Sequence, residues 1–151
     1  MTERGCDAAA ADLIAAYRVA HPADPSVSTL GWHEGQMRAF AGDDAAARPL
    51  FVAATLTRSP FNWFGWNDYV AATIAFIDRD RQALLAARER LAATPRPETH
   101  GWTDPDGNPI PPPSLAPGAA WPDNLAVVDA LVRCFDRSYR AAYEAEDCYR
   151  Q

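Results

Sequence analysis

Apolar residues recur at helical spacing along most of the chain, and polar or proline-containing turns separate the apolar segments. Near the start, Leu13, Ile14, Tyr17 and Val19 gather on one broad side, after Asp7 as a helix cap and before a His-Pro stop. No segment shows the sustained apolar–polar alternation that a half-buried strand requires. The pattern therefore predicts an all-α fold of about seven helices. Their expected ranges are 7–20, 28–41, 44–57, 66–77, 81–93, 124–136 and 138–149.

One long segment differs in kind from the predicted helices. Residues 95–122 hold nine of the thirteen prolines of the chain, and proline breaks both helices and strands because it lacks an N–H donor. We predict a single domain over residues 1–151 in which 95–122 form a proline-rich insertion loop. Within it, the sequence from Asp104 to Asn108 is similar to the start of a calcium loop. The closing acidic ligand is missing, which favours a tight turn.

The charge balance excludes some classes of partner. The 151 residues include 20 acidic and 14 basic side chains, for a net charge of −6. Such a chain does not collect phosphates, so we predict no nucleic-acid partner and favour a basic protein or peptide. No apolar run approaches the roughly 18–20 residues that cross a bilayer, so no membrane association is expected. All basic residues are arginine, which we interpret as the codon bias of a high-GC bacterial genome; lysine Schiff-base chemistry is excluded.

The first residues and the three cysteines bear on the compartment. The charged start is not followed by an apolar core, which predicts a cytoplasmic protein, or a periplasmic one if Met1 replaces a removed signal peptide. A regular helical hairpin would place Cys134 about 12 Å from Cys148, too far for a bridge, so Cys134 is expected as a buried thiol. A disulfide between Cys6 and Cys148 stays open as an alternative, and it would indicate an oxidising compartment.

Residues 28–60 carry a pattern of small residues, a turn and a closing proline. Small residues stand where two antiparallel helices would touch, a Gly-Asp pair supplies the turn, and an alanine precedes a phenylalanine by four positions. The residues that make up the pattern are Gly35, Gly42, Asp43, Ala47, Phe51, Ala54 and Pro60. This segment resembles a tetratricopeptide repeat.

Looser copies of the pattern follow the first. One lies about 36–37 residues later, around Arg79 and Asp80, and a weaker one lies around Arg137 and Ser138. The chain also departs from the family, because Trp32 stands one residue late and Glu34 and Arg38 replace its leucine and tyrosine. The resemblance implies a stack of antiparallel helical hairpins with helix 7–20 capping one end. A different all-α bundle is the alternative.

In tetratricopeptide repeats the first helix of each hairpin lines a concave face. The resemblance implies that this face is formed here by Trp32, Gln36, Phe40, Trp66, Tyr69 and Thr73. Aromatic residues with one polar partner per turn suit an extended peptide or a helix lying in a groove. Two other interpretations stay open: the aromatic side chains pack the core, or the proline-rich loop fills the groove.

The predicted function is a non-catalytic interaction module that binds a protein or peptide, as a monomer or weak homodimer. One alternative is a small acidic inhibitor or immunity-type protein that uses the loop 98–120. Another is an enzyme that binds a small molecule or sugar at the aromatic cluster 61–69. We predict no catalytic residue, metal ligand or cofactor, because nucleophile elbows, phosphate loops and paired cysteines are missing. His33 and Glu34 also fail the zinc-protease pattern, since Met37 stands where it needs histidine.

Overall fold

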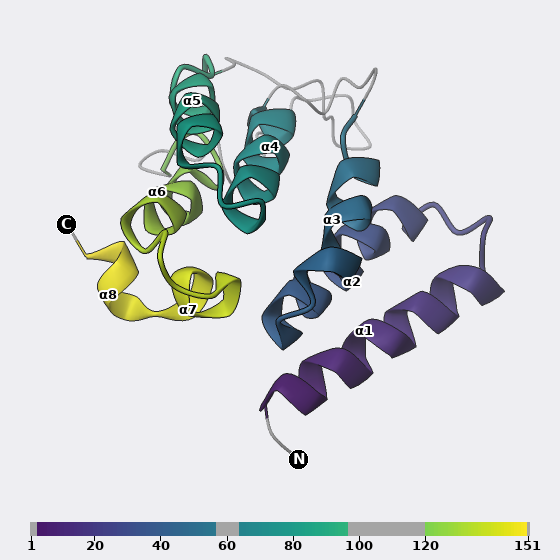
Figure 1. Ribbon diagram of the computed structural model, residues 1–151. Coiled ribbons are helices and arrows are strands. Elements are labelled where there is room, and N and C mark those ends of the chain that lie inside the picture. Colours follow the sequence, from purple (N-terminus) through teal and green to yellow (C-terminus); the bar gives the residue numbers. More distant parts are fainter. Residues whose placement is uncertain (1–2, 57–63, 97–119, 151) are drawn as a thin grey trace, which may run out of the picture.

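The computed structural model describes residues 3–56, 64–96 and 120–150 of the chain, and these contain eight α-helices and no strand. The all-α fold is therefore confirmed (Figure 1). The helices are α1 (Glu3–Ala20), α2 (Val27–Ala41), α3 (Asp44–Ala53), α4 (Trp66–Ile77), α5 (Arg81–Ala92), α6 (Leu125–Arg133), α7 (Tyr139–Glu144) and α8 (Glu146–Tyr149).

The turns inside the first two hairpins have the same design. After α2, Gly42 adopts a left-handed conformation with φ 87°, and Asp43 caps α3 by accepting a hydrogen bond from the N–H of Ala46. After α4, Arg79 adopts the left-handed conformation with φ 59°, and Asp80 caps α5 in the same way. Glycine enters this region freely and arginine does not, so the second turn needs compensating contacts.

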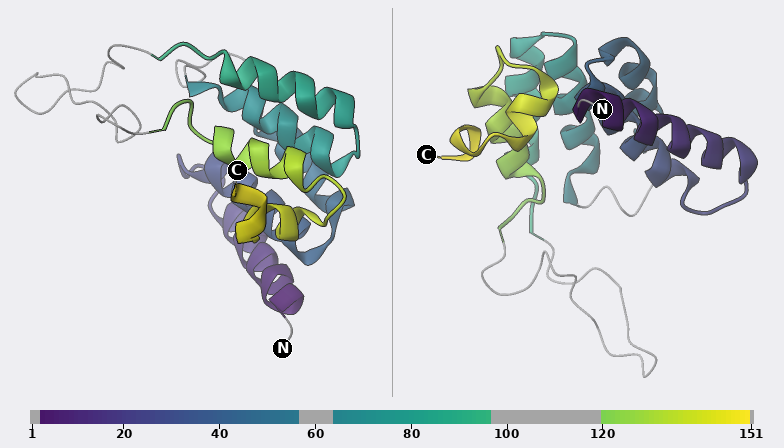
Figure 2. Two further views of the ribbon diagram at one scale, coloured as in Figure 1. Left: turned by 90° about the vertical axis from the view of Figure 1, so that its left-hand side faces the viewer. Right: turned by 90° about the horizontal axis from the view of Figure 1, so that it is seen from below.

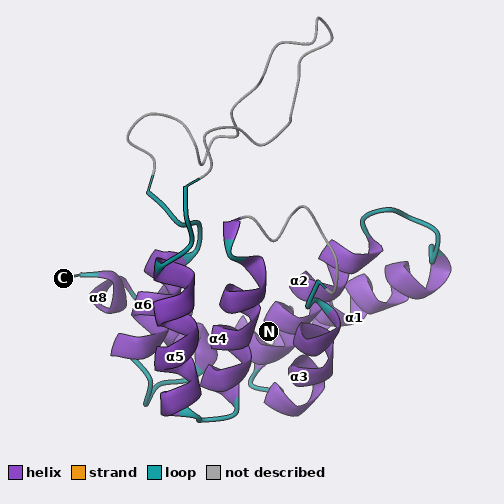
Figure 3. Ribbon diagram, turned by 90° about the horizontal axis from the view of Figure 1, so that it is seen from above, coloured by secondary structure: helices purple, strands orange, loops and turns teal. Residues whose placement is uncertain are grey.

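Helices α1 to α6 pack in chain order from one side of the molecule to the other (Figure 3). α1 packs along α2, α2 pairs with α3, α3 contacts α4, α4 pairs with α5, and α6 packs on both helices of that second pair. The expected stack of helical hairpins with helix 7–20 at its end is present. α1 begins before Asp7, however, so the expectation that Asp7 caps it was wrong.

The last hairpin departs from the expected pattern. We expected one helix over 138–149, but α7 ends at Glu144, Ala145 is extended with ψ 123°, and α8 is a separate short helix. α7 packs on α6 and also on α2 (Figures 1 and 2). The third hairpin therefore folds back toward the first one.

Small residues let the helices approach closely. Ala47, Ala72, Ala130 and Ala142 are fully buried, and a Cβ added to Gly35 would lie 2.8 Å from the ring of Phe51. This is the contact role that the sequence predicts for Gly35 and Ala47. Large side chains then fill the space around these points, foremost Tyr139, Phe51 and Phe76.

Across the described ranges, none of the helices combines the length and apolar character that crossing a membrane requires.

Candidate functional site

The six residues that the sequence predicts as a binding face lie together. Trp32, Gln36 and Phe40 come from α2, and the other three come from α4. The Trp32 ring lies 4.9 Å from that of Trp66 and 5.2 Å from that of Tyr69, centroid to centroid. α2 and α4 thus present one surface of six residues, which we call the α2–α4 wall: Trp32, Gln36, Phe40, Trp66, Tyr69 and Thr73.

The wall is not open to solvent. Five of its residues are at most 9% exposed, and only Trp66 is half-buried. We expected these side chains to project from a free concave face, and the structure places them in the core instead. The interpretation that aromatic side chains at helical spacing pack the core describes this conformation.

Among the described residues, helix α7 of the same chain covers the wall. The ring of Tyr139 lies 5.5 Å from that of Phe40, and the ring of Tyr143 lies 5.4 Å from it. Gln36 donates from Nε2 to the hydroxyl of Tyr143 over 3.5 Å. The proline-rich loop is the other cover that the sequence suggests, and its residues 97–119 lie outside the described residues.

The centre of this interface holds a buried hydroxyl. Tyr139 is fully enclosed, and its hydroxyl makes no hydrogen bond of normal geometry with the residues that the structure describes, although the polar side chains of Gln36, Thr73 and Tyr69 lie around it. Thr73 lies beside it, but its hydroxyl donates to the carbonyl of Tyr69. Burial raises the pKa of Tyr139 and of Tyr69 well above the usual value, because an ionised phenolate would have no water around it.

Two polar contacts fix the flanks of α7. Arg140 forms an ion pair with Asp7 on α1, and its guanidinium also lies over the ring of Phe40, 5.2 Å from the ring centroid, as in a cation–π contact. Before α7, Ser138 caps the helix by accepting from the N–H of Ala141. α7 is therefore joined to the first hairpin and to α1 as well as to α6.

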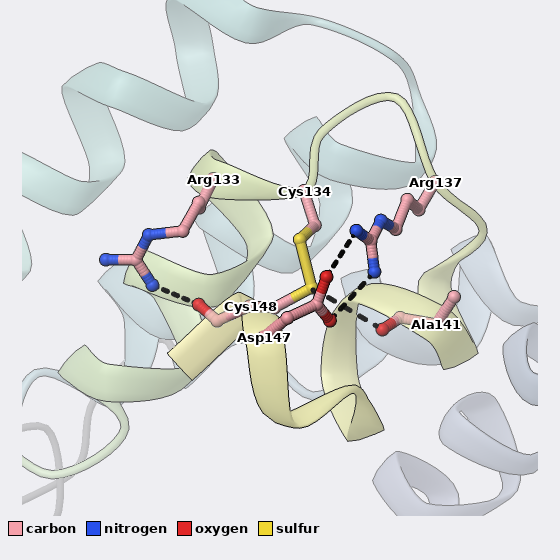
Figure 4. Close-up of polar contacts among 6 residues, drawn as sticks. All are labelled: Arg133, Cys134, Arg137, Ala141, Asp147 and Cys148. Carbon is pink, nitrogen blue, oxygen red and sulfur yellow. Dashed lines mark hydrogen bonds and ion pairs between the residues drawn. A yellow bond between two sulfur atoms is a disulfide. The ribbon is translucent and has the colours of Figure 1, made fainter. Parts of the chain in front are cut away.

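A disulfide joins Cys134, at the end of α6, to Cys148 in α8, with their Cα atoms 5.9 Å apart (Figure 4). The expectation of a buried Cys134 thiol was wrong, and so was the alternative pairing of Cys148 with Cys6, which is exposed and free. The distance argument assumed one regular helix to the end of the chain. The break at Ala145 instead turns α8 back onto α6, and the two sulfurs meet.

Arginine side chains surround the disulfide (Figure 4). Arg133 donates to the carbonyl of Cys148, and Arg137 forms a two-pronged ion pair with Asp147 at 3.0 and 2.6 Å. The Arg137 hydrogen bonds lower the pKa of Asp147. These contacts cross the same loop that the disulfide closes, so they hold α8 on the end of α6.

The aromatic cluster 61–69 is described only from Phe64 onward. Trp66 donates from its indole nitrogen to the carbonyl of Ala54 (2.8 Å), and Asn67 exchanges two hydrogen bonds with the backbone of Leu56. These contacts join the end of α3 to the start of α4. A cleft of about 380 Å³ lies beside them, lined by Pro25, Ser28, Thr29, Ala54, Leu56, Phe64 and Trp66.

The titratable residues of α2 are committed to structural contacts. His33 bonds from Nδ1 to Oε1 of Gln36 (2.9 Å), while the buried Glu34 pairs with Arg18 of α1. The two neighbours thus point to different partners and do not form an acid–base pair. In the part of the chain that the structure describes, no group of three or more His, Cys, Asp or Glu side chains could hold a metal ion.

The fold and the site define an all-α protein of packed helical hairpins in which helix α7 covers the α2–α4 wall. Comparison of the chain with protein-family models, with curated proteins and with solved structures gives no match.

Proposed function

We propose that this chain is a non-catalytic interaction module that binds a helical segment of a protein or peptide on the α2–α4 wall. One observation carries the proposal: the wall already holds a helix. α7 lies on it with two tyrosines against Phe40 and one hydrogen bond from Gln36. A surface of aromatic side chains with few polar groups is the chemistry by which grooves hold amphipathic helices.

Two further features support this proposal. The resemblance of residues 28–60 to a tetratricopeptide repeat implies that Trp32, Gln36 and Phe40 lie on the ligand-binding side of that family, and the looser second copy implies the same for Trp66, Tyr69 and Thr73. The net charge of −6 would speed the approach of a basic partner by electrostatic steering. The partner therefore combines an apolar helix face with basic residues outside that face.

The test is affinity capture with four baits: the parent, Gln36→Ala, Trp66→Ala and Val52→Ala. Val52 is exposed on α3 and is not part of the wall, so it serves as the matched control. Circular dichroism and thermal unfolding first establish which variants keep the fold. A partner that the parent and Val52→Ala capture, and that folded wall variants lose, supports the proposal. A partner retained by all four baits would place binding elsewhere and overturn it.

A further inference from the structure

α7 has the features of a ligand as well as those of a structural helix. It is only six residues long, which is below the length at which a helix is stable by itself. Its two tyrosines stand four residues apart, so both rings point to the same side, and both contact Phe40. The segment thus presents an aromatic stripe to the wall, as an amphipathic peptide would.

The fit between α7 and the wall is incomplete. The buried hydroxyl of Tyr139 makes no hydrogen bond of normal geometry with the described residues, although Gln36, Thr73 and Tyr69 lie around it, and this poor geometry disfavours the docked position. The hydrogen bond from Gln36 to Tyr143 is at the long limit, at 3.5 Å. A ligand tyrosine that can satisfy its hydroxyl, or a phenylalanine, would meet the wall without this penalty.

A covalent link compensates for the incomplete fit. α7 lies wholly inside the loop closed by Cys134 and Cys148, whose positions are 14 apart. Closing the loop restricts how far α7 can move from the wall, and the Arg137–Asp147 pair crosses the same loop. The disulfide therefore limits the distance over which the docked helix can leave.

We infer that the α2–α4 wall binds an amphipathic helix with two aromatic residues four positions apart. α7 competes with such a helix for the wall, and the Cys134–Cys148 disulfide keeps α7 in place. The inference rests on the proposed function. A dithiol reductant breaks the Cys134–Cys148 disulfide. It gives two electrons and two protons to the disulfide, becomes a disulfide itself, and leaves Cys134 and Cys148 as thiols. The released α7 then exposes the wall to a partner helix.

Two readouts on the full chain test the inference. The first is hydrogen exchange of the α7 amides before and after reduction, with the α4 amides as internal reference. The second is binding of a fluorescent peptide that repeats residues 136–145, with a peptide carrying alanine for both tyrosines as control. Cys134→Ser with Cys148→Ser mimics reduction, and Cys6→Ser is the matched cysteine control, because Cys6 is exposed and free.

We expect reduction to speed α7 exchange about tenfold or more and to tighten peptide binding by about the same factor, since affinity scales with the open fraction. The variant with serine at both Cys134 and Cys148 should show faster α7 exchange and tighter peptide binding without reductant. Cys6→Ser should show neither change. Tyr139→Phe removes the buried hydroxyl and should move both readouts the opposite way.

The outcomes separate the two proposals. Unchanged α7 exchange, or equal peptide binding in both redox states, would overturn the proposal that the disulfide controls access to the wall. It would not contradict the proposal that the wall binds a helix. Faster α7 exchange without any binding of the tyrosine peptide would overturn the helix-binding surface, and with it both the proposed function and this inference.

Discussion

Arg140 on α7 is paired with Asp7 on α1, although 133 positions separate them in the sequence. Both side chains are largely buried, and the guanidinium also lies over Phe40. The pair joins the first helix of the chain to the segment that covers the α2–α4 wall. Nothing local to either residue indicates the other as a partner.

We predict that Asp7→Asn lowers the free energy of unfolding by about 2 kcal/mol, because it removes a charged hydrogen bond from a poorly solvated site. Asp12→Asn is the matched control on the same helix. Asp12 pairs with Arg38, but its side chain is 70% exposed against 12% for Asp7, so its loss should cost less than about 1 kcal/mol. Urea unfolding of both variants checks this, and equal losses would contradict the structural role given to Asp7.

The cysteine pairing can be tested by counting thiols. The disulfide between Cys134 and Cys148 and the free, exposed Cys6 predict one reactive thiol per chain before reduction and three after it. The measurement is thiol titration in denaturant, followed by peptide mapping of the labelled sites. Label on Cys134 before reduction would show that the pairing described here is wrong.

The turns and most helix bounds could be predicted from the sequence because their causes are local. Asp43 and Asp80 cap the helices that follow them, and α4 spans the expected residues 66–77 without change. The meeting of the α2 and α4 site residues was also predictable, since the repeat pattern places them on corresponding first helices. Their role in binding stays a prediction.

The C-terminal arrangement could not be predicted, because its causes are long-range. No glycine or proline marks the break at Ala145, and the break decides which cysteines meet. The expected helix 124–136 ends at Arg133, and the carbonyls of Phe135 and Arg137 beyond it accept hydrogen bonds from Arg79, which lies in a distant turn. Burial of the wall was one of the interpretations that the sequence left open, but its cover by α7 depends on the turn between α6 and α7 and was not predicted.

Gly35→Ala should destabilise the first hairpin. The added Cβ would lie 2.8 Å from the Phe51 ring in the tight contact between α2 and α3, and overpacking of this kind costs about 1–3 kcal/mol. The matched control is Gly31→Ala on the same helix. Its Cβ would meet only the guanidinium of Arg18, at 3.1 Å, which pairs with Glu34 and would have to shift slightly. The better helix propensity of alanine, about 1 kcal/mol, opposes that cost, so Gly31→Ala should lose less stability than Gly35→Ala. Thermal unfolding of both variants distinguishes these effects.

Stability should fall in alkali because of the buried tyrosines. The folded state raises the pKa of Tyr139 and Tyr69 above the ordinary value of 10.0, so the unfolded chain loses these protons first as the pH rises. Their contribution is complete below about pH 10 and decreases above it, by about 1.4 kcal/mol per pH unit for each group. Tyr139→Phe should reduce the decrease of unfolding free energy with pH by the contribution of one tyrosine, about 1.4 kcal/mol per pH unit. Urea unfolding between pH 9 and 11 measures it, and an unchanged slope would contradict the burial of that hydroxyl.

Arg79 combines an unfavourable backbone conformation with two useful hydrogen bonds, and two substitutions separate these effects. Its guanidinium donates to the carbonyls of Phe135 (2.6 Å) and Arg137 (2.9 Å), while its φ of 59° is strained for any residue with a Cβ. Arg79→Ala loses the hydrogen bonds and keeps the strain, so it should cost about 1–2 kcal/mol.

Arg79→Gly loses the same hydrogen bonds but relieves the strain, so it should be more stable than the alanine variant by about 1 kcal/mol. Both variants should speed hydrogen exchange in the turn before α7, because the carbonyls that hold this turn lose their donor. Arg81→Ala is the control, since Arg81 only lies over the Phe135 ring at 5.5 Å. Equal stability of the glycine and alanine variants at position 79 would show that the left-handed backbone there is not strained, and it would contradict this prediction.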